Sequence, residues 1–184
     1  WSPAFMVGKQ VTGARLGIIG MGRVGRALAV KARGFDMKVH YFNRTALSED
    51  DAKGAIYHDT LESLLCVADF LSLHCPATAE TTNLMNKERF NLLPKGAVIV
   101  NSARGALIDE AALMRALDAR QISAAGLDCF AIEPGGNPGF SSYDNIFMLP
   151  HIGSATKQTR DAMGFRALDN LDVFFAGQKP RDTL

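Results

Sequence analysis

The sequence predicts an α/β fold, a doubly wound parallel sheet, and three observations support this class. Short apolar runs alternate with longer segments of helical period, which is the pattern of βαβ units. Several of these runs are uninterrupted, as in residues 16–20 (LGIIG) and 97–101 (AVIVN), which is typical of strands buried on both faces. With 184 residues, 47% hydrophobic and 21% charged, the chain can form one core without disulfide or metal staples.

Six strands and five helices are expected. Each strand is a short, mostly apolar run that ends at a glycine or a polar cluster: Arg15–Gly20, Met37–Phe42, Phe70–Leu73, Ala97–Asn101, Ser123–Leu127 and Ile146–Leu149. The helices keep an apolar spacing near 3.6 residues: about Gly22–Arg33, Leu61–Val67, Asn86–Leu92, Glu110–Arg120 and Thr156–Ala176. Asp59, three residues before Glu62, and Asp109 are predicted N-caps, because a short carboxylate accepts from free amide groups of a first helical turn. Residues 133–139 (EPGGNPG) interrupt both periodicities and predict a surface loop.

Charge and cysteine content exclude several function classes. Twenty basic and 19 acidic side chains give a net charge of +1, so neither nucleic acid nor an anionic membrane is expected as a partner. Three cysteines without CxxC spacing favour a reducing compartment over a disulfide framework. No apolar run is long enough for a membrane span and no signal-peptide layout is present, so we expect a soluble, cytoplasmic protein. No metal site is expected, because the four histidines are scattered: His40, His58, His74 and His151.

A glycine-rich turn predicts a dinucleotide site. Residues 20–25 (GMGRVG) match GxGxxG directly between an expected strand and helix, the context that this motif requires. Gly20 and Gly22 allow a tight turn close to a pyrophosphate, and Gly25 allows close packing of helix on strand. The helix N-terminus, at Arg23 and Val24, then offers free amide groups to the phosphates. Arg23 either reaches the pyrophosphate or is a solvated helix residue.

The second strand ends where such folds bind the adenosine ribose. An acidic side chain there would accept from a 2′-hydroxyl, but this chain has Asn43, Arg44 and Thr45. A neutral, a cationic and a hydroxyl side chain suit a 2′-phosphate, so NADP(H) is expected over NAD(H). The alternative is that Arg44 is an exposed loop residue and that both cofactors are accepted.

Residues that follow the later strands form a candidate catalytic set, because ligands of open α/β sheets bind at the carboxyl ends of the strands. They are His74, Cys75, Pro76, Ser102, Ala103, Arg104, Asp128, Glu133, His151 and Gly153. These types suit hydride exchange with a 2-keto or 2-hydroxy acid. His151 can donate the proton, with Glu133 raising its pKa, while the Arg104 fork holds the substrate carboxylate. The alternatives are a structural histidine and a surface ion pair.

Five linked motifs resemble a known family. GMGRVG, HCP, NSARGALID, GLDCFAIEP and PHIGSAT, in this order, are similar to the cofactor-binding domain of the D-isomer-specific 2-hydroxyacid dehydrogenases. WSPAFMVG, YFNRT and FRALDNLDVFFAG are most similar to the glyoxylate/hydroxypyruvate reductase branch. The resemblance implies a Rossmann-type fold, a catalytic trio of Arg104, Glu133 and His151, and Asp128 at the nicotinamide carboxamide. Five further residues are implied to line the cofactor groove: Cys75, Pro76, Ser102, Ala103 and Gly153. Cys129 is expected to be a buried apolar thiol rather than a nucleophile.

The resemblance also implies a second, smaller substrate domain, most of which is missing from this chain. We therefore expect a linker or truncated interdomain helix at 1–12, the dinucleotide-binding domain at 13–176 and an exit segment at 177–184. Such a chain should bind cofactor yet turn over poorly, because closure completes the site. A homodimer is implied as well.

Three functions stay open. The first is reduction of glyoxylate or hydroxypyruvate with NADPH. The second is another reaction of the same family, such as that of a phosphoglycerate dehydrogenase. The third is a dinucleotide-dependent binding module like the corepressors that share this fold, because fold alone does not decide function.

Overall fold

The computed structural model describes residues 1–3 and 7–183. Residues 4–6 of the expected linker and residue 184 of the expected exit segment lie outside the described part of the chain. The chain divides into two compact units, residues 1–150 and residues 151–184. Within the described residues, no helix is both long and apolar enough to cross a membrane.

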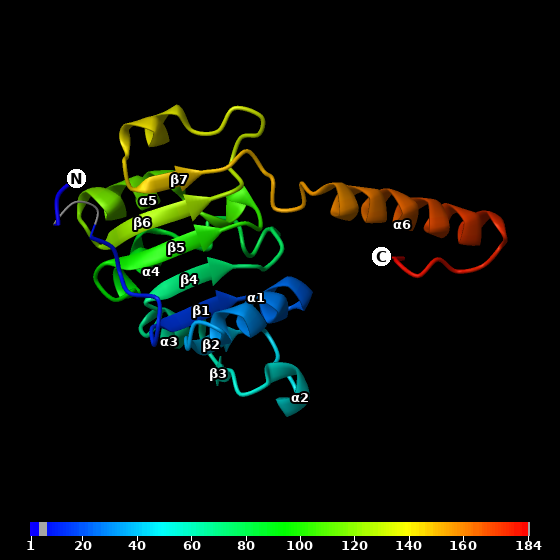
Figure 1. Ribbon diagram of the computed structural model, residues 1–184, viewed down its shortest axis with the longest axis horizontal. Helices are drawn as coiled ribbons and strands as arrows, with labels where there is room; N and C mark the ends of the chain where they lie inside the picture. The colour runs from blue at the N-terminus through cyan, green and yellow to red at the C-terminus, as the bar shows by residue number, and fades with distance from the viewer. Residues whose placement is uncertain (4–6, 184) are drawn as a thin grey trace. The chain divides into compact units, whose positions relative to one another are not determined.

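The first unit is built on a seven-stranded sheet in which every neighbouring pair is parallel. In sheet order the strands are β3 (Ile56–His58), β2 (Lys38–Phe42), β1 (Arg15–Ile19), β4 (Phe70–Leu73), β5 (Ala97–Asn101), β6 (Ile122–Leu127) and β7 (Ile146–Met148). In Figure 1 the arrowheads of β4, β5, β6 and β7 point the same way. This order reverses between β1 and β4, which makes the sheet doubly wound and Rossmann-type, as the sequence predicts.

The expected number of six strands is wrong by one, because β3 was not predicted. It has three residues, and at the edge of the sheet Ile56 and Tyr57 are exposed, so it lacks the apolar run that marks the buried strands. The short helix α2 (Glu49–Ala52) was also missed, since three of its four residues are acidic. Two 3₁₀ turns, η1 (Gly105–Leu107) and η2 (Pro138–Ser142), complete the connections.

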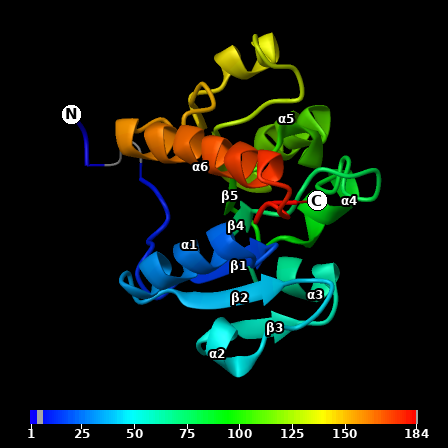
Figure 2. The ribbon, with the colours of Figure 1, turned by 90° about the vertical axis from the view of Figure 1, so that its right-hand side faces the viewer.

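Helices cover both faces of the sheet (Figure 2). One face packs on α1 (Arg23–Arg33), and its core includes Leu16 and Ile18 of β1. The opposite face packs on α3 (Leu61–Leu65), α4 (Lys87–Leu92) and α5 (Glu110–Asp118), and there Ile19 joins the larger core. Successive side chains of β1 thus point to opposite faces, both buried, which explains its continuous apolar sequence.

The helix caps were predicted with mixed success. Asp109 caps α5, since its side chain accepts from the Ala112 N–H at 2.9 Å. The cap predicted at Asp59 is wrong, because α3 starts at Leu61 and Thr60 occupies the cap position. The Thr60 hydroxyl accepts from the Ser63 N–H at 3.2 Å.

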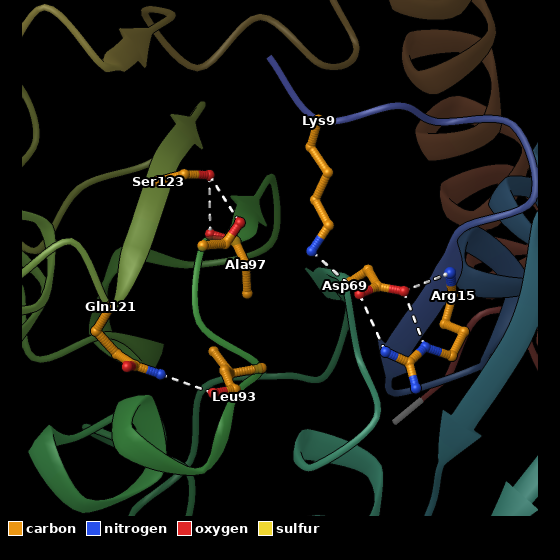
Figure 3. A network of polar contacts seen from close by, with 8 residues as sticks. Lys9, Arg15, Asp69, Leu93, Ala97, Gln121 and Ser123 are labelled. Atoms are coloured by element: carbon orange, nitrogen blue, oxygen red, sulfur yellow. Dashed lines mark hydrogen bonds and ion pairs between the residues drawn. The ribbon is translucent and has the colours of Figure 1, made fainter. Parts of the chain in front are cut away.

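Polar contacts hold the amino-terminal edge of the sheet together (Figure 3). The Asp69 carboxylate, just before β4, accepts from Arg15 Nε at 2.8 Å and pairs with Lys9 Nζ at 3.0 Å. Above all, the hydrogen bond from Arg15 lowers the pKa of Asp69 well below its usual range. Near the starts of β5 and β6, the Gln121 side-chain amide donates to the Leu93 carbonyl at 2.6 Å. The Ser123 hydroxyl donates to the Ala97 carbonyl at 3.3 Å. These contacts fix strand starts and leave the carboxyl ends to the candidate site.

The second unit consists mainly of α6 (Lys157–Phe175), with Thr156 as its N-cap. Its end turns back on the helix, because Asp182 forms an ion pair with Arg166 and accepts from the Asn170 amide at 3.0 Å.

Candidate active site

The turn after β1 has the form that a pyrophosphate cradle needs. Gly20 has a φ of +89°, and a Cβ there would lie 2.6 Å from the Cys75 backbone nitrogen. A Cβ on Gly25 would lie 2.7 Å from the Gly20 carbonyl oxygen. By contrast, a Cβ on Gly22 would meet no atom within 4 Å. The first and third glycines are therefore required by the fold itself, while the middle one leaves open space beside the turn.

The N-terminus of α1 is left without a side-chain cap. In the described part of the chain the other five α-helices begin with a Ser, Thr, Asn or Asp whose side chain accepts from a first-turn amide. At α1 the N-cap is Gly22, with no cap hydrogen bond and no acidic residue in the first turn, where Arg23 and Val24 are exposed. Free N–H groups and the positive end of the helix dipole therefore remain for an anion, which fits a dinucleotide phosphate.

The loop after β2 is tied to this turn. Asn43 Oδ1 accepts from the Met21 N–H at 2.7 Å, and the Asn43 carbonyl accepts from the Tyr57 hydroxyl at 3.4 Å. Arg44 and Thr45, next along the chain, are exposed. The pKa of Glu80 is lowered by the Thr78 hydroxyl first and also by the charge of Arg44. The two hydrogen bonds of Asn43 therefore hold the loop after β2 against the glycine turn and β3.

His74 and Cys75, which follow β4, do not form a nucleophilic pair. His74 Nε2 is hydrogen bonded to the Ser72 hydroxyl at 2.8 Å, and burial lowers the pKa of the imidazole. Burial raises the pKa of the Cys75 thiol, which keeps it protonated at neutral pH. Pro76 is exposed, and its carbonyl accepts from the Thr81 hydroxyl at 2.8 Å. The backbone of Cys75 contacts Gly20, so this segment forms a wall of the glycine turn.

A buried asparagine shapes the turn after β5. Asn101, 1% exposed, donates from Nδ2 to the Arg104 carbonyl at 2.8 Å and accepts at Oδ1 from the Ala103 N–H at 3.1 Å. Both ends of the amide are used, which leaves Ser102 and the Arg104 side chain exposed. We did not assign Asn101 from the sequence, although a polar residue closing an apolar buried strand is a signal for such a role.

The segment after β6 crosses the Arg104 turn at close range. A Cβ on Gly105 would lie 1.9 Å from the Phe130 carbonyl carbon, so only glycine fits at this crossing. Just before it, Asp128 and Cys129 are buried, at 7% and 3% exposed. Beyond it, Glu133 Oε1 accepts from the Phe130 N–H at 2.8 Å.

Hydrogen bonds join the turn that carries Arg104 to the segment that carries Asp128 and Glu133. The Cys129 thiol, next to Asp128, donates to the Asn101 carbonyl at 3.5 Å, and the Asn101 side chain holds the Arg104 carbonyl. Burial first, and then the charges of Glu133 and Asp128, raise the pKa of Cys129 to about 11, so it is the inert thiol expected from the sequence. His151 and Gly153 belong to the second unit, so their place in the site stays a prediction.

A family model for the D-isomer specific 2-hydroxyacid dehydrogenases, NAD binding domain, matches residues 1–153. The chain belongs to this family. The glycine turn, the uncapped α1, Arg104, Asp128 and Glu133 lie in the matched part. Within the described residues, no group of three or more His, Cys, Asp or Glu side chains could hold a metal ion.

The chain is also similar to named dehydrogenases and reductases. The chain is 44% identical to a glycerate dehydrogenase of Hyphomicrobium methylovorum, covering 96% of this chain and 56% of the relative. It is 40% identical to a glyoxylate reductase of Pyrococcus furiosus, covering 98% and 54%. The solved structure of an NADPH-dependent glyoxylate/hydroxypyruvate reductase from Sinorhizobium meliloti, in complex with NADP and malonate, superposes with a TM-score of 0.84 at 36% identity, covering 89% and 50%. The chain thus spans about half the length of the curated relatives it matches.

Proposed function

We propose that this protein reduces a small 2-keto acid with NADPH, converting glyoxylate to an achiral 2-hydroxy acid or hydroxypyruvate to the D-2-hydroxy acid. The observation that carries the proposal is the contact between the turn that carries Arg104 and the segment that carries Glu133. Asn101 holds the Arg104 carbonyl and accepts from the Cys129 thiol, and Gly105 packs on the Phe130 backbone. Arg104 and Glu133 follow strands at the carboxyl-terminal edge of the sheet, and the glycine turn and the uncapped helix α1 follow β1 at the same edge. A carboxylate-binding cation and a carboxylate beside a dinucleotide cradle are what this chemistry requires. The similarity to a glyoxylate reductase supports the choice of substrate.

Each site residue has one role in the proposed reaction. Arg104 binds the substrate carboxylate through its planar fork and polarises the adjacent carbonyl. His151 donates the proton to the carbonyl oxygen, and Glu133 is the carboxylate proposed to orient the imidazole. Asp128 holds the nicotinamide carboxamide. When bound, the reduced nicotinamide supplies the hydride.

The cofactor preference follows from the ribose end. A carboxylate in place of Asn43 would repel a 2′-phosphate, whereas the exposed Arg44 and Thr45 can bind one. The cradle residues would hold the rest of the cofactor: Gly20, Gly22, Arg23, Val24 and Gly25 at the pyrophosphate, and Cys75, Pro76, Ser102, Ala103 and Gly153 along the groove. The Sinorhizobium meliloti reductase, whose structure holds NADP, supports this choice.

A binding titration followed by a turnover assay tests the proposal. Residues 1–184 are titrated with NADPH and with NADH, and binding is followed by the fluorescence of the reduced nicotinamide. One charge-assisted contact to a 2′-phosphate predicts that NADPH binds about tenfold tighter or more. Equal affinities would contradict the cofactor assignment.

The turnover assay addresses the reaction itself. We propose that residues 1–184 alone turn over slowly and that the protein works as a homodimer with its substrate domain, since domain closure excludes water. In that form, oxidation of NADPH should depend on glyoxylate or hydroxypyruvate. A protein that binds NADPH but oxidises it with neither acid would refute the substrate assignment.

A further inference from the structure

Glu110, the first residue of α5, holds the loop that carries Glu133. Its Oε1 accepts from the Ala131 N–H at 2.9 Å, and its Oε2 accepts from the Asn137 side-chain amide at 2.9 Å. The two anchored residues flank Glu133 on either side. We propose that Glu110 is a positioning residue that sets the place of Glu133, an assignment that rests on the catalytic role proposed for Glu133.

Hydrogen bonds inside the loop connect the two residues that Glu110 anchors, Ala131 and Asn137. Between them, the Gly136 N–H donates to the Ile132 carbonyl at 2.9 Å. At the far anchor, Asn137 Oδ1 accepts from the Gly139 N–H at 2.9 Å and so caps η2. Residues 132–135 of this segment are exposed, so core packing contributes little to their conformation. Hydrogen bonds therefore matter for the position of the loop, and two of them, at Ala131 and Asn137, end on the Glu110 carboxylate.

Glu110 also connects the turn that carries Arg104 to the loop that carries Glu133. It lies six residues after Arg104, and between them Gly105 packs against the Phe130 backbone, next to the first anchor at Ala131. Arg104, η1 and the start of α5 thus form one continuous support on which the Glu133 loop lies.

A general helix effect does not account for this arrangement. An acidic residue in a first turn interacts favourably with the helix dipole, whatever its side chain contacts. Asp109 already caps α5. Glu88, the second residue of α4, is the comparison, because it also lies in the first turn of a helix and its side chain forms no hydrogen bond or ion pair with other described residues.

Three variants separate the loop-holding role of Glu110 from the general effect of a first-turn carboxylate on its helix. Glu110→Ala removes both anchors. Glu110→Gln keeps one acceptor oxygen but turns an N–H₂ group toward one of the two donors, so it keeps one anchor. Glu88→Ala removes a first-turn carboxylate without loosening the loop and is the matched control.

The experiment uses the protein with its substrate domain. It measures kcat and KM for glyoxylate per bound cofactor, the NADPH Kd, and hydrogen exchange at the Ala131 amide. A displacement of the order of 1 Å can cost about 100-fold, so Glu110→Ala should lower kcat by about 10- to 100-fold, with the NADPH Kd changed less than about twofold. Glu110→Gln should lie between wild type and Glu110→Ala, exchange at Ala131 should become faster in the same order, and Glu88→Ala should match wild type in every readout.

Two outcomes would overturn the proposal. If Glu110→Ala keeps wild-type kcat per bound cofactor, even with a lower melting temperature, Glu110 is merely structural. If the Ala131 amide exchanges as in wild type, the anchor is absent. A wild-type protein that reduces no 2-keto acid would instead refute the proposed function, and the exchange measurement would still decide whether Glu110 holds the loop.

Discussion

The side chain of Asn43 holds the glycine turn, since its Oδ1 accepts from the Met21 N–H at 2.7 Å. This bond joins the end of β2 to the turn between β1 and α1. The residue expected at the cofactor ribose therefore also shapes the pyrophosphate cradle. Substitutions at Asn43 should affect the two ends of the cofactor in ways that can be separated.

Asn43→Ala should weaken NADPH and NADH alike, because the loss of a hydrogen bond of about 1 kcal/mol frees the Met21 amide and loosens the turn, for about a fivefold rise in both Kd values. Asn43→Asp keeps an acceptor for that amide but adds a negative charge, so it should weaken NADPH selectively. Fluorescence titration of both variants with both cofactors checks this. Equal weakening in Asn43→Asp would show that the 2′-phosphate lies elsewhere.

Arg44→Ala should raise the NADPH Kd by about tenfold or more and leave the NADH Kd unchanged, because only NADPH carries the 2′-phosphate. A parallel loss of NADH binding in Arg44→Ala would count against the ribose assignment.

Arg23→Ala separates the two interpretations of Arg23. An equal rise in both Kd values would place it at the pyrophosphate, and no change would make it a solvated helix residue.

Gly22→Ala should keep the fold but lose the cofactor. A Cβ at Gly22 meets no atom of the chain, so the melting temperature should stay near that of wild type. The same Cβ would occupy the space expected for the pyrophosphate, so both cofactors should bind at least about tenfold more weakly. Gly25→Ala is the contrast, since its Cβ would lie 2.7 Å from the Gly20 carbonyl and should destabilise the fold. Unchanged cofactor affinity in Gly22→Ala would refute the cradle.

His151→Ala, made in the protein with its substrate domain, should lower kcat by about 100-fold or more, because general acid catalysis contributes roughly that much. Cofactor affinity should change little, since the proposed proton donor acts on the substrate. Steady-state kinetics and the NADPH titration give the two quantities. Wild-type kcat in this variant would exclude His151 as the donor.

Asp69→Asn should destabilise the chain at pH 7 by about 1–3 kcal/mol, the usual worth of hydrogen bonds to a charged group. The pKa of Asp69 is lowered in the folded state, mainly by Arg15. Its stabilisation is therefore complete above the unfolded pKa of about 4 and is lost as the pH falls toward the folded value. Urea unfolding at pH 7, 5 and 3 should show the difference from wild type shrinking at pH 3.

The control for this series is Asp144→Asn, at an exposed carboxylate after η2. It should change the free energy of unfolding by less than about 0.5 kcal/mol at every pH. A difference between Asp69→Asn and wild type that is constant from pH 7 to pH 3 would show that the ion pair contributes nothing.

Local patterns in the sequence were sufficient to predict the fold class. Phe70–Leu73 and Ala97–Asn101 were predicted with the bounds that the structure has, because strands in a sheet covered on both faces are mostly apolar. The glycine turn was located because the backbone needs glycine there, which makes the requirement visible in the residue type itself. The edge strand β3 was missed for the opposite reason, since a half-exposed strand of three residues has no distinctive pattern.

The site depends on contacts that no local pattern contains. Asn43 bonds to a residue 22 positions away, and Glu110 bonds to residues 21 and 27 positions away. The sequence indicated that Arg104, Asp128 and Glu133 follow parallel strands, and hence that they share one edge. Tertiary structure alone joined the Arg104 turn to the buried Cys129 through Asn101 and made Glu110 the support of the loop. Hydrogen bonds between distant residues form only after the sheet has brought the strand ends together, so their partners are decided by packing.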